Sequence, residues 1–386
     1  MPTEPSTVET LVQQLLIGFT NGTVFALIAL GYTMVYGIIE LINFAHGDLF
    51  MLGSFLALTL IGWLGLTLVG TGGIVFGLIF IIVFCSLFCG ALNWSVDRIV
   101  YRPLRSAPKL APLVSAIGVS FIFQNIGLFW GGLTGRPSLL FGLILALVIT
   151  PIAGLALAGV KNFASSRKMA MAEWLPRAAT VMFGVAAFIV GLTLPSLSVD
   201  VFAGGTSAAA PKDVPNLISR ANLFGSGVIQ FTGKDLLVVL TTVPIMVGLT
   251  LFVKYTKLGK AMRATAQNPT AARLMGIDVD RVIGATFLIG GCLAGAASVI
   301  YAVYINTVNY QIGYQNGLYA FTAAVIGGIG NIPGAMLGGI LIGVIRALSD
   351  QYIGAQWQPA VLFGILILIL IFRPSGLLGA RVREKV

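Results

Sequence analysis

Three ionisable side chains lie close together near the beginning of the sequence. Glu40, His46 and Asp48 stand between two long apolar runs, and His46 is the only histidine. Ionisable groups inside membrane segments are costly and usually face water or the protein interior, so these residues suggest a proton relay. The alternative, which the charge pattern favours, is a polar helix break near the cytoplasmic surface where Glu40 and Asp48 stay hydrated.

Other patterns that carry chemistry are absent from the sequence. It has no Ser-His-acid set, no paired carboxylates and no phosphate-binding G-x-x-x-x-G-K-[ST] pattern. Cys85, Cys89 and Cys292 all lie in apolar runs. Two thiols four residues apart without a further ligand do not make a metal site, so we expect them to pack in a core. We therefore expect no catalytic residue, metal or cofactor, and any ATPase would be a separate chain.

The composition is typical of a membrane protein. Hydrophobic residues make up 57% of the chain and charged residues only 9%, and the mean hydropathy is +0.97. Soluble domains contain about 25% charged residues. Many apolar runs exceed the roughly 20 residues that a membrane helix needs, and ten-residue alternating segments of a barrel are absent. The sequence predicts an all-α, polytopic helical bundle.

The apolar runs predict about eleven membrane segments. One of them, 318–330, is short and either spans the membrane or is re-entrant. They cover residues 12–37, 39–62, 69–94, 111–131, 139–160, 178–194, 235–253, 282–303, 318–330, 333–350 and 358–372. The cations gather between or after these segments, at residues 98–109, 161–177, 254–281 and 373–385. Because basic segments stay in the cytoplasm, we expect the N-terminus outside and the C-terminus inside. Topology thus explains the net charge of +10 without a nucleic-acid partner.

Residues 254–281 form the longest polar run between apolar segments, KYTKLGKAMRATAQNPTAARLMGIDVDR. A residue before proline avoids the α region, so a helix entering this run should end at Asn268. Asn268 is then able to cap a new helix that begins at Pro269, and Gly276 to end it in the left-handed conformation. The pattern predicts a short helix over 269–275 with an apolar tip. It is either a docking element or an ordinary solvated loop.

Several blocks of the sequence resemble the permease subunits of bacterial ABC importers of the high-affinity branched-chain amino acid family, LivH type. The central run matches with LGKAMRA at 258–264 and LMGI at 274–277. The other blocks are ALIALGYTMVYG at 26–37, INFAHG at 42–47 and FTAAVIGGIGNIPGA at 321–335. Together they cover most of the chain except about 138–235.

The resemblance implies that residues 254–281 are a cytoplasmic coupling loop and that the chain works within a larger assembly. This assembly comprises two cytosolic ABC ATPase subunits, a second homologous permease subunit and a periplasmic substrate-binding protein, in the lipid bilayer of a bacterial inner membrane. The coupling residues are Gly259, Lys260, Arg263, Asn268, Pro269, Arg273, Leu274, Met275 and Gly276. Candidates for the translocation pathway are Asn43, His46, Gly327, Gly328, Gly330, Asn331 and Pro333.

The chain departs from the family pattern at residues 138–235. We interpret 1–386 as a single permease domain in which this stretch is an insertion with two extra spans and an external loop. The insertion either pads the bundle or binds an accessory partner. Branched-chain amino acids are the expected substrates, and urea or short-chain amides are the alternative. A remote alternative of another class is an ion-coupled secondary transporter, which would need a buried carboxylate or an ion cage.

Glycine spacing predicts close contacts between helices. Gly330, Gly334 and Gly338 are spaced by four residues, as are two further pairs, Gly339 with Gly343 and Gly291 with Gly295. Small residues at this spacing let helix backbones approach closely in lipid. Arg346 and Asp350 share a helix face in the same region and are expected to form a pair.

Overall fold

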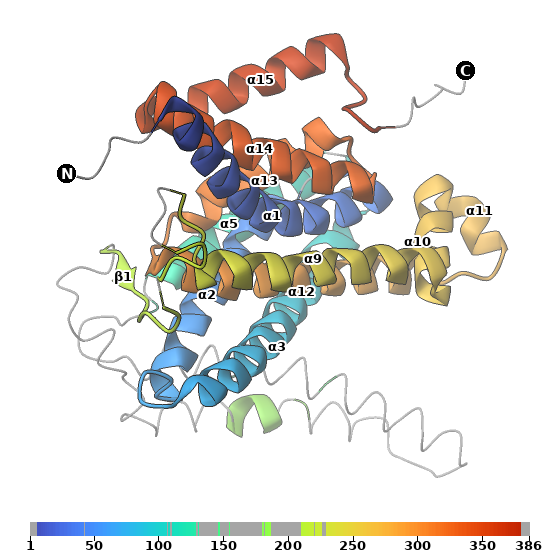
Figure 1. The fold of residues 1–386 in the computed structure, drawn as a ribbon. Helices are drawn as coiled ribbons and strands as arrows, with labels where there is room; N and C mark the ends of the chain where they lie inside the picture. Colours follow the sequence, from blue (N-terminus) through green and yellow to red (C-terminus); the bar gives the residue numbers. More distant parts are fainter. Residues whose placement is uncertain are drawn as a thin grey trace.

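The computed structural model describes residues 6–41, 43–105, 107–108, 110–128, 130, 210–219, 221–225 and 229–379, with isolated positions between 146 and 186 (Figure 1). These residues are mostly helical, and 8 of their helices are long and apolar enough to cross a membrane. The predicted spans at 139–160 and 178–194 lie almost entirely outside the described residues.

The described helices agree with the predicted apolar runs. The long ones are α1 (Thr7–Ile39), α2 (Ala45–Trp63), α3 (Thr71–Val96), α5 (Leu110–Leu128), α9 (Gly233–Tyr255), α12 (Val279–Ile305), α14 (Ile332–Tyr352) and α15 (Gln358–Phe372). Between them lie the π-helix Asp97–Tyr101, α4 (Arg102–Leu104), α10 (Lys257–Gln267), α11 (Pro269–Leu274) and the 3₁₀ turn Ala355–Trp357. Helix α13 (Ile312–Gly327) has 16 residues, which confirms that this segment is short.

Helix α1 begins earlier than its apolar run because a capping box starts it. The Ser6 hydroxyl accepts a hydrogen bond from the Glu9 amide at 3.2 Å, and the Glu9 carboxylate accepts one from the Ser6 amide at 2.8 Å. This reciprocal pair satisfies backbone donors that a helix start leaves free. The hydropathy pattern could not show this polar first turn.

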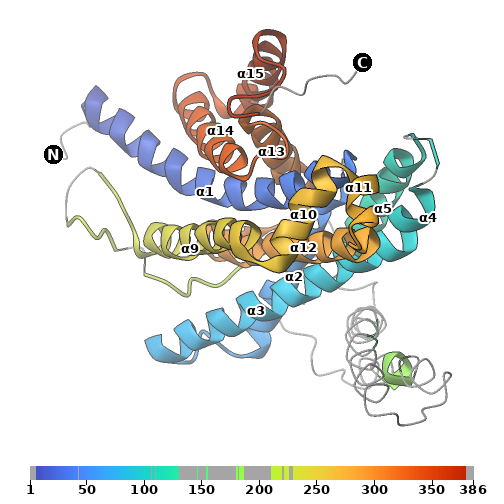
Figure 2. The ribbon, with the colours of Figure 1, turned by 90° about the vertical axis from the view of Figure 1, so that its right-hand side faces the viewer.

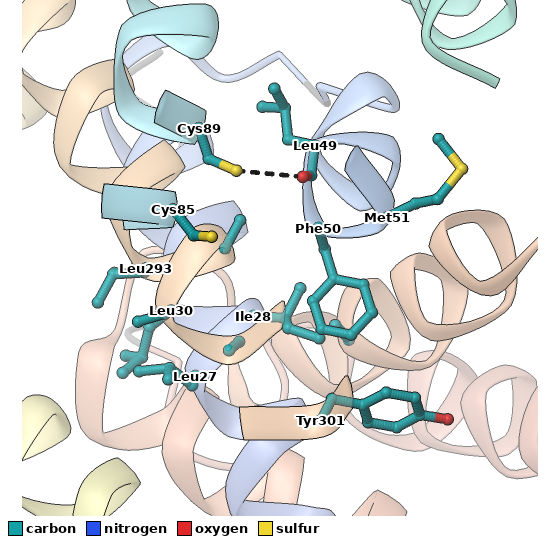
Figure 3. Close-up of a cluster of buried hydrophobic side chains, with 14 of the residues drawn as sticks. Leu27, Ile28, Leu30, Leu49, Phe50, Met51, Cys85, Cys89, Leu293 and Tyr301 are labelled. Atoms are coloured by element: carbon teal, nitrogen blue, oxygen red, sulfur yellow. Dashed lines mark hydrogen bonds between the residues drawn. The ribbon is translucent and has the colours of Figure 1, made fainter. Parts of the chain in front are cut away.

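Helix α1 runs through the middle of the bundle, and every residue from 22 to 35 is buried. Its side chains meet those of α2, α3 and α12 in one apolar core, drawn in Figure 3. Cys85 and Cys89 pack there, and the Cys89 thiol donates to the Leu49 carbonyl at 3.3 Å. The prediction that these cysteines pack in a core is confirmed.

Glycines hold the central helices at backbone contact. On α14, a Cβ added to Gly339 would lie 2.3 Å from Cα of Ala26 on α1. On α12, a Cβ added to Gly291 would lie 2.4 Å from the Cys89 carbonyl oxygen of α3. Gly338 meets the Ala323 carbonyl of α13 in the same way. The prediction of close contacts at these glycines is confirmed, whereas Gly330 lies in a loop with φ +87°.

The Arg346–Asp350 pair is not formed. The Arg346 guanidinium lies over the rings of Phe25 and Tyr319, with its carbon 5.5 and 5.1 Å from the ring centroids. Asp350 instead accepts a hydrogen bond from Gln358 at 3.3 Å. Spacing along the helix could not reveal these aromatic neighbours on α1 and α13.

The two ends of the bundle differ. Helices α10 and α11 project from one end (Figure 1). Helix α4 lies at the same end (Figure 2), where its Arg102 pairs with Asp280 at the start of α12. At the other end, β1 (Lys212–Asp213) pairs antiparallel with β2 (Thr307–Val308), which follows α12. There the buried Lys234 ammonium donates to Asn306 and, at 2.7 Å, to Asn216, which ties α9 to both segments.

We predict that Gly339→Val destabilises the protein by separating α14 from α1. The branched side chain would overlap the Ala26 backbone, and overpacking of this kind costs about 1–3 kcal/mol. Gly364→Val on α15 is the matched control, because a Cβ there meets no atom within 4 Å. Thermal unfolding of the purified chain in detergent measures the difference. Equal unfolding temperatures for the two variants would contradict the close contact.

Candidate functional site

The turn between α10 and α11 is formed as its sequence predicts. Asn268 adopts an extended backbone, with φ −158° and ψ 101°, and so ends α10. Its side-chain oxygen accepts a hydrogen bond from the Ala271 amide at 3.0 Å, and Pro269 occupies the first position of α11. Gly276 has φ +81°, the left-handed conformation that ends the helix. Local sequence therefore fixes the short helix independently of the bundle.

Helix α10 presents one face to the bundle and the other to solvent. Met262 and Thr265 are buried, whereas the Lys260 and Arg263 side chains are exposed. Gly259 permits the sharp turn from α9, since a Cβ there would lie 2.3 Å from the Val253 carbonyl oxygen. The buried face lies across a cavity of about 70 Å³ from the end of α1 and from the loop that contains Gly330. Helix α10 thus connects the projecting α11 to the central helices.

The tip of α11 is apolar and uncovered. Leu274 and Met275 are 84% and 83% exposed, and Arg273 beside them is also exposed. Ala272 is the one buried residue of α11 and anchors it to the rest of the chain. Neighbouring large apolar side chains at a projecting tip, flanked by cations, are suited to insertion into a groove of another protein.

A cluster of ion pairs, which the sequence did not single out, fixes the base of this region. Arg105 pairs with Asp97 at 2.6 Å and also with Asp280, and Arg102 pairs with Asp280 at 3.3 Å. Asp280 lies in the first turn of α12, directly after α11. The cluster therefore ties the segment that follows α3 to the segment that follows α11. The only signal in the sequence is that Asp97 and Asp280 are acidic residues beside or within otherwise basic runs.

Asn43 is the centre of a buried hydrogen-bond chain. It accepts from the Tyr101 hydroxyl at 3.1 Å and donates to the Asn93 side-chain oxygen at 3.1 Å. Asn93 in turn donates to the Phe287 carbonyl at 2.6 Å. These hydrogen bonds link the α1–α2 connection to α3 and, through Asn93, to α12. Asn43 is thus held in place by side-chain hydrogen bonds to α3 and to the π-helix, as a buried amide requires.

The expectation that Glu40 and Asp48 both stay hydrated at a polar helix break is confirmed for Glu40 and wrong for Asp48, and His46 is buried beside it. The His46 and Asp48 side chains are each 1% exposed, and only Glu40 stays exposed. The first turn of α2 packs into the bundle because Gly47 lies against Gly313 and Gly317 of α13. The charge rule places loops on a side of the membrane but does not show how far a connection folds back between helices.

His46 and Asp48 each make specific contacts inside the bundle. The His46 ring packs edge-on against Tyr32, with 4.7 Å between centroids. Gly31 makes room for it, since a Cβ there would lie 2.3 Å from His46 Nε2. Asp48 accepts a hydrogen bond from the Ser120 hydroxyl of α5.

The other pathway candidates lie in the loop between α13 and α14 or in the helix turns that adjoin it. Gly328 and Gly330 have positive φ angles of 105° and 87°. The segment after α15 forms backbone hydrogen bonds with the end of α13, where the Leu378 amide donates to the Gly327 carbonyl at 3.0 Å. Asn331 caps α14 through the Gly334 amide at 3.1 Å, and Pro333 lies in the first turn of that helix. Their packing assigns them structural roles, and a role in a pathway stays a prediction.

A large groove, also missed by the sequence reasoning, runs between α5, α13 and α15. Its volume is about 910 Å³, and its lining mixes aromatic rings with a few polar side chains. The lining includes Tyr32, Ser120, Gln124, Phe321 and Phe363. Tyr32 and Phe321 also line a small cavity beside Asn43, so Asn43 lies directly behind the groove wall. His46 and the loop glycines are not among the groove-lining residues.

Comparison with known proteins places nearly the whole chain in one family. Residues 14–371 match the family described as "Branched-chain amino acid transport system / permease component". The chain is 35% identical to the high-affinity branched-chain amino acid transport system permease protein BraD of Pseudomonas aeruginosa, over 97% of this chain and 98% of that protein.

Two further relatives match this chain to different extents. The high-affinity branched-chain amino acid transport system permease protein LivH of Escherichia coli K12 is 34% identical and covers 97% of each chain. The fructose import permease protein FruG of Bifidobacterium longum is 28% identical over 31% of this chain and 37% of that protein. No solved structure matches the chain. With a match over nearly its full length and relatives of this identity, the chain belongs to the family of branched-chain amino acid transport system permease components.

Proposed function

We propose that the chain is the transmembrane permease subunit of an ABC importer in a bacterial inner membrane, and that it forms a translocation pathway for branched-chain amino acids. Family membership over residues 14–371 carries this proposal. The uncovered apolar tip of α11 supports it, because such a subunit must be driven from outside itself. The sequence contains no nucleotide-binding pattern, so ATP hydrolysis belongs to separate partner subunits.

The proposed topology has about eleven membrane segments, with the N-terminus outside and the C-terminus inside. Two described basic segments support it, because Arg102 of the first pairs with Asp280 of the central one and the two must lie at the same end. The segment after α15, which follows Arg373, also reaches this end, since it pairs with the loop that contains Gly330. Basic segments gathered at one end mark the cytoplasmic side.

The proposed partners attach at opposite ends. One cytosolic ATPase subunit contacts α11 of this chain. The other contacts the corresponding helix of a second homologous permease subunit. A periplasmic binding protein delivers substrate at the end where β1 pairs with β2. Residues 138–235 remain, on this proposal, an insertion within one permease domain.

Coupling would run from α11 through α10 into the bundle. The residues proposed to contact or shape the ATPase-binding region are Gly259, Lys260, Arg263, Asn268, Pro269, Arg273, Leu274, Met275 and Gly276. Movement of α11 would shift the buried face of α10 against α1 and the Gly330 loop, and hence displace α13 and α14. Asn43, His46, Gly327, Gly328, Gly330, Asn331 and Pro333 would act in the pathway by setting the position of these helices.

We predict that Leu274→Glu with Met275→Glu reduces ATP-driven uptake about tenfold or more, because charging interface anchors costs about 2 kcal/mol. Uptake is measured in vesicles that contain the complete transporter, together with the amount of chain inserted in the membrane. Gln267→Glu, exposed at the end of α10, is the matched control for added charge in the same loop. Full uptake by the doubly charged variant would refute the coupling role of α11.

The substrate proposal has a separate test. The binding protein that docks on this permease should bind leucine, isoleucine or valine, because in such systems the binding protein selects the substrate. Calorimetric titration with leucine, urea and acetamide compares the candidate classes directly. Binding of urea or acetamide without leucine would replace the proposed substrate while leaving the permease assignment intact.

A further inference from the structure

A buried carboxylate lies directly behind the wall of the groove between α5, α13 and α15. Asp48 is 1% exposed, and none of the ion pairs among the described residues includes it. A carboxylate inside a membrane bundle is costly, and chains retain one mainly where it has a partner or a function. No role in the coupling region accounts for Asp48, since it lies among α2, α5 and α13.

Hydrogen bonds connect this carboxylate to the groove. Ser120 donates its hydroxyl to Oδ2 of Asp48, and Gln124 donates its side-chain amide to the Ser120 oxygen at 3.2 Å. Ser120 and Gln124 both line the groove. The second carboxylate oxygen, Oδ1, is buried without a hydrogen-bond partner among the described residues. A carboxyl oxygen with unused acceptor capacity therefore lies one side chain away from the groove.

The rest of the groove is suited to a small amphipathic molecule. Tyr32 and Phe321 stand on its wall with 6.2 Å between ring centroids, and Phe363 lines it from α15. Binding sites for small molecules commonly combine such apolar surfaces with a few polar groups that fix orientation. A volume of about 910 Å³ exceeds the needs of one amino acid and leaves room for passage.

We propose that Asp48, Ser120 and Gln124 form a binding site for the ammonium group of an amino acid in transit. An entering ammonium would displace the Gln124 amide from the Ser120 oxygen and place its charge beside Asp48. The aliphatic side chain would then lie against the aromatic wall of Tyr32 and Phe321. This inference rests on the proposed function and deepens it, because urea and short amides carry no cation for such a site to hold.

A test that needs no transport uses charged thiol reagents. We expect Gln124→Cys to react about tenfold faster with the cationic reagent 2-aminoethyl methanethiosulfonate than with the anionic 2-sulfonatoethyl reagent, because the Asp48 carboxylate attracts the cation and repels the anion, and a difference of about 1.4 kcal/mol is tenfold. Adding Asp48→Asn, which keeps the side-chain shape, should remove this preference. Rates are measured on the complete transporter and corrected for the native cysteines.

Phe363→Cys on the α15 wall is the matched control, since it lines the same groove away from α2. Its charge preference should not change with Asp48→Asn. Equal rates for both reagents at Gln124→Cys, or a preference that survives Asp48→Asn, would overturn the ammonium site. These outcomes do not depend on whether the chain imports leucine, so they are distinct from a failure of the proposed function.

A transport measurement completes the test. In vesicles with the complete transporter and leucine-loaded binding protein, Asp48→Asn and Ser120→Ala should each reduce leucine uptake about tenfold. ATP hydrolysis stimulated by the loaded binding protein should persist, because the coupling region is intact. Ser54→Ala is the control for a lost buried hydroxyl, since Ser54 bonds backbone carbonyls of α2 and α12. If Asp48→Asn fails to fold, Ser120→Ala decides; unchanged uptake in that variant would overturn the proposal.

Discussion

Backbone contact between helices is the constraint on which the rest of the structure depends. Apolar side chains gain little free energy when they move from lipid into a contact between helices, because lipid tails are equally apolar. Membrane helices therefore associate through close packing of small residues. Gly339 and Gly343 bring α14 onto α1, and Gly291 brings α12 onto α3, at distances that leave no space for a Cβ. Helices joined in this way are expected to move as units. A displacement at one end, where α10 meets α1 and the Gly330 loop, would therefore be carried along the bundle.

Much of this architecture could be predicted from the sequence because its signals are local. The Asn268-Pro269 step and Gly276 determine α11 through caps and allowed backbone angles, which depend on neighbouring residues alone. Hydropathy located the membrane helices that the structure describes, and glycine spacing indicated which faces touch. Where the prediction failed, at Asp48 and at Arg346, the deciding contacts come from helices far away in the sequence. No local pattern specifies which helices those will be.

The structure distinguishes two kinds of polar side chain in the bundle. Asn43 and Asn331 have their hydrogen bonds satisfied by neighbouring elements and hold the fold in place. Asp48 does not, because one oxygen has no partner among the described residues while the other leads through Ser120 to an open groove. On the proposed function, coupling and substrate contact therefore belong to different regions. On this proposal the ATPase subunits contact the exposed α11, and the amino acid enters the groove beside α13.

The orientation and exposure of α11 are the central claim, and labelling of Met275→Cys tests them most directly. In sealed cells, a membrane-impermeant maleimide added outside should leave this cysteine unlabelled, and opening the cells should allow rapid labelling because Met275 is 83% exposed. Co-expression of the ATPase subunits should then protect it. Labelling from outside intact cells, or full labelling in the presence of the ATPase subunits, would contradict the account.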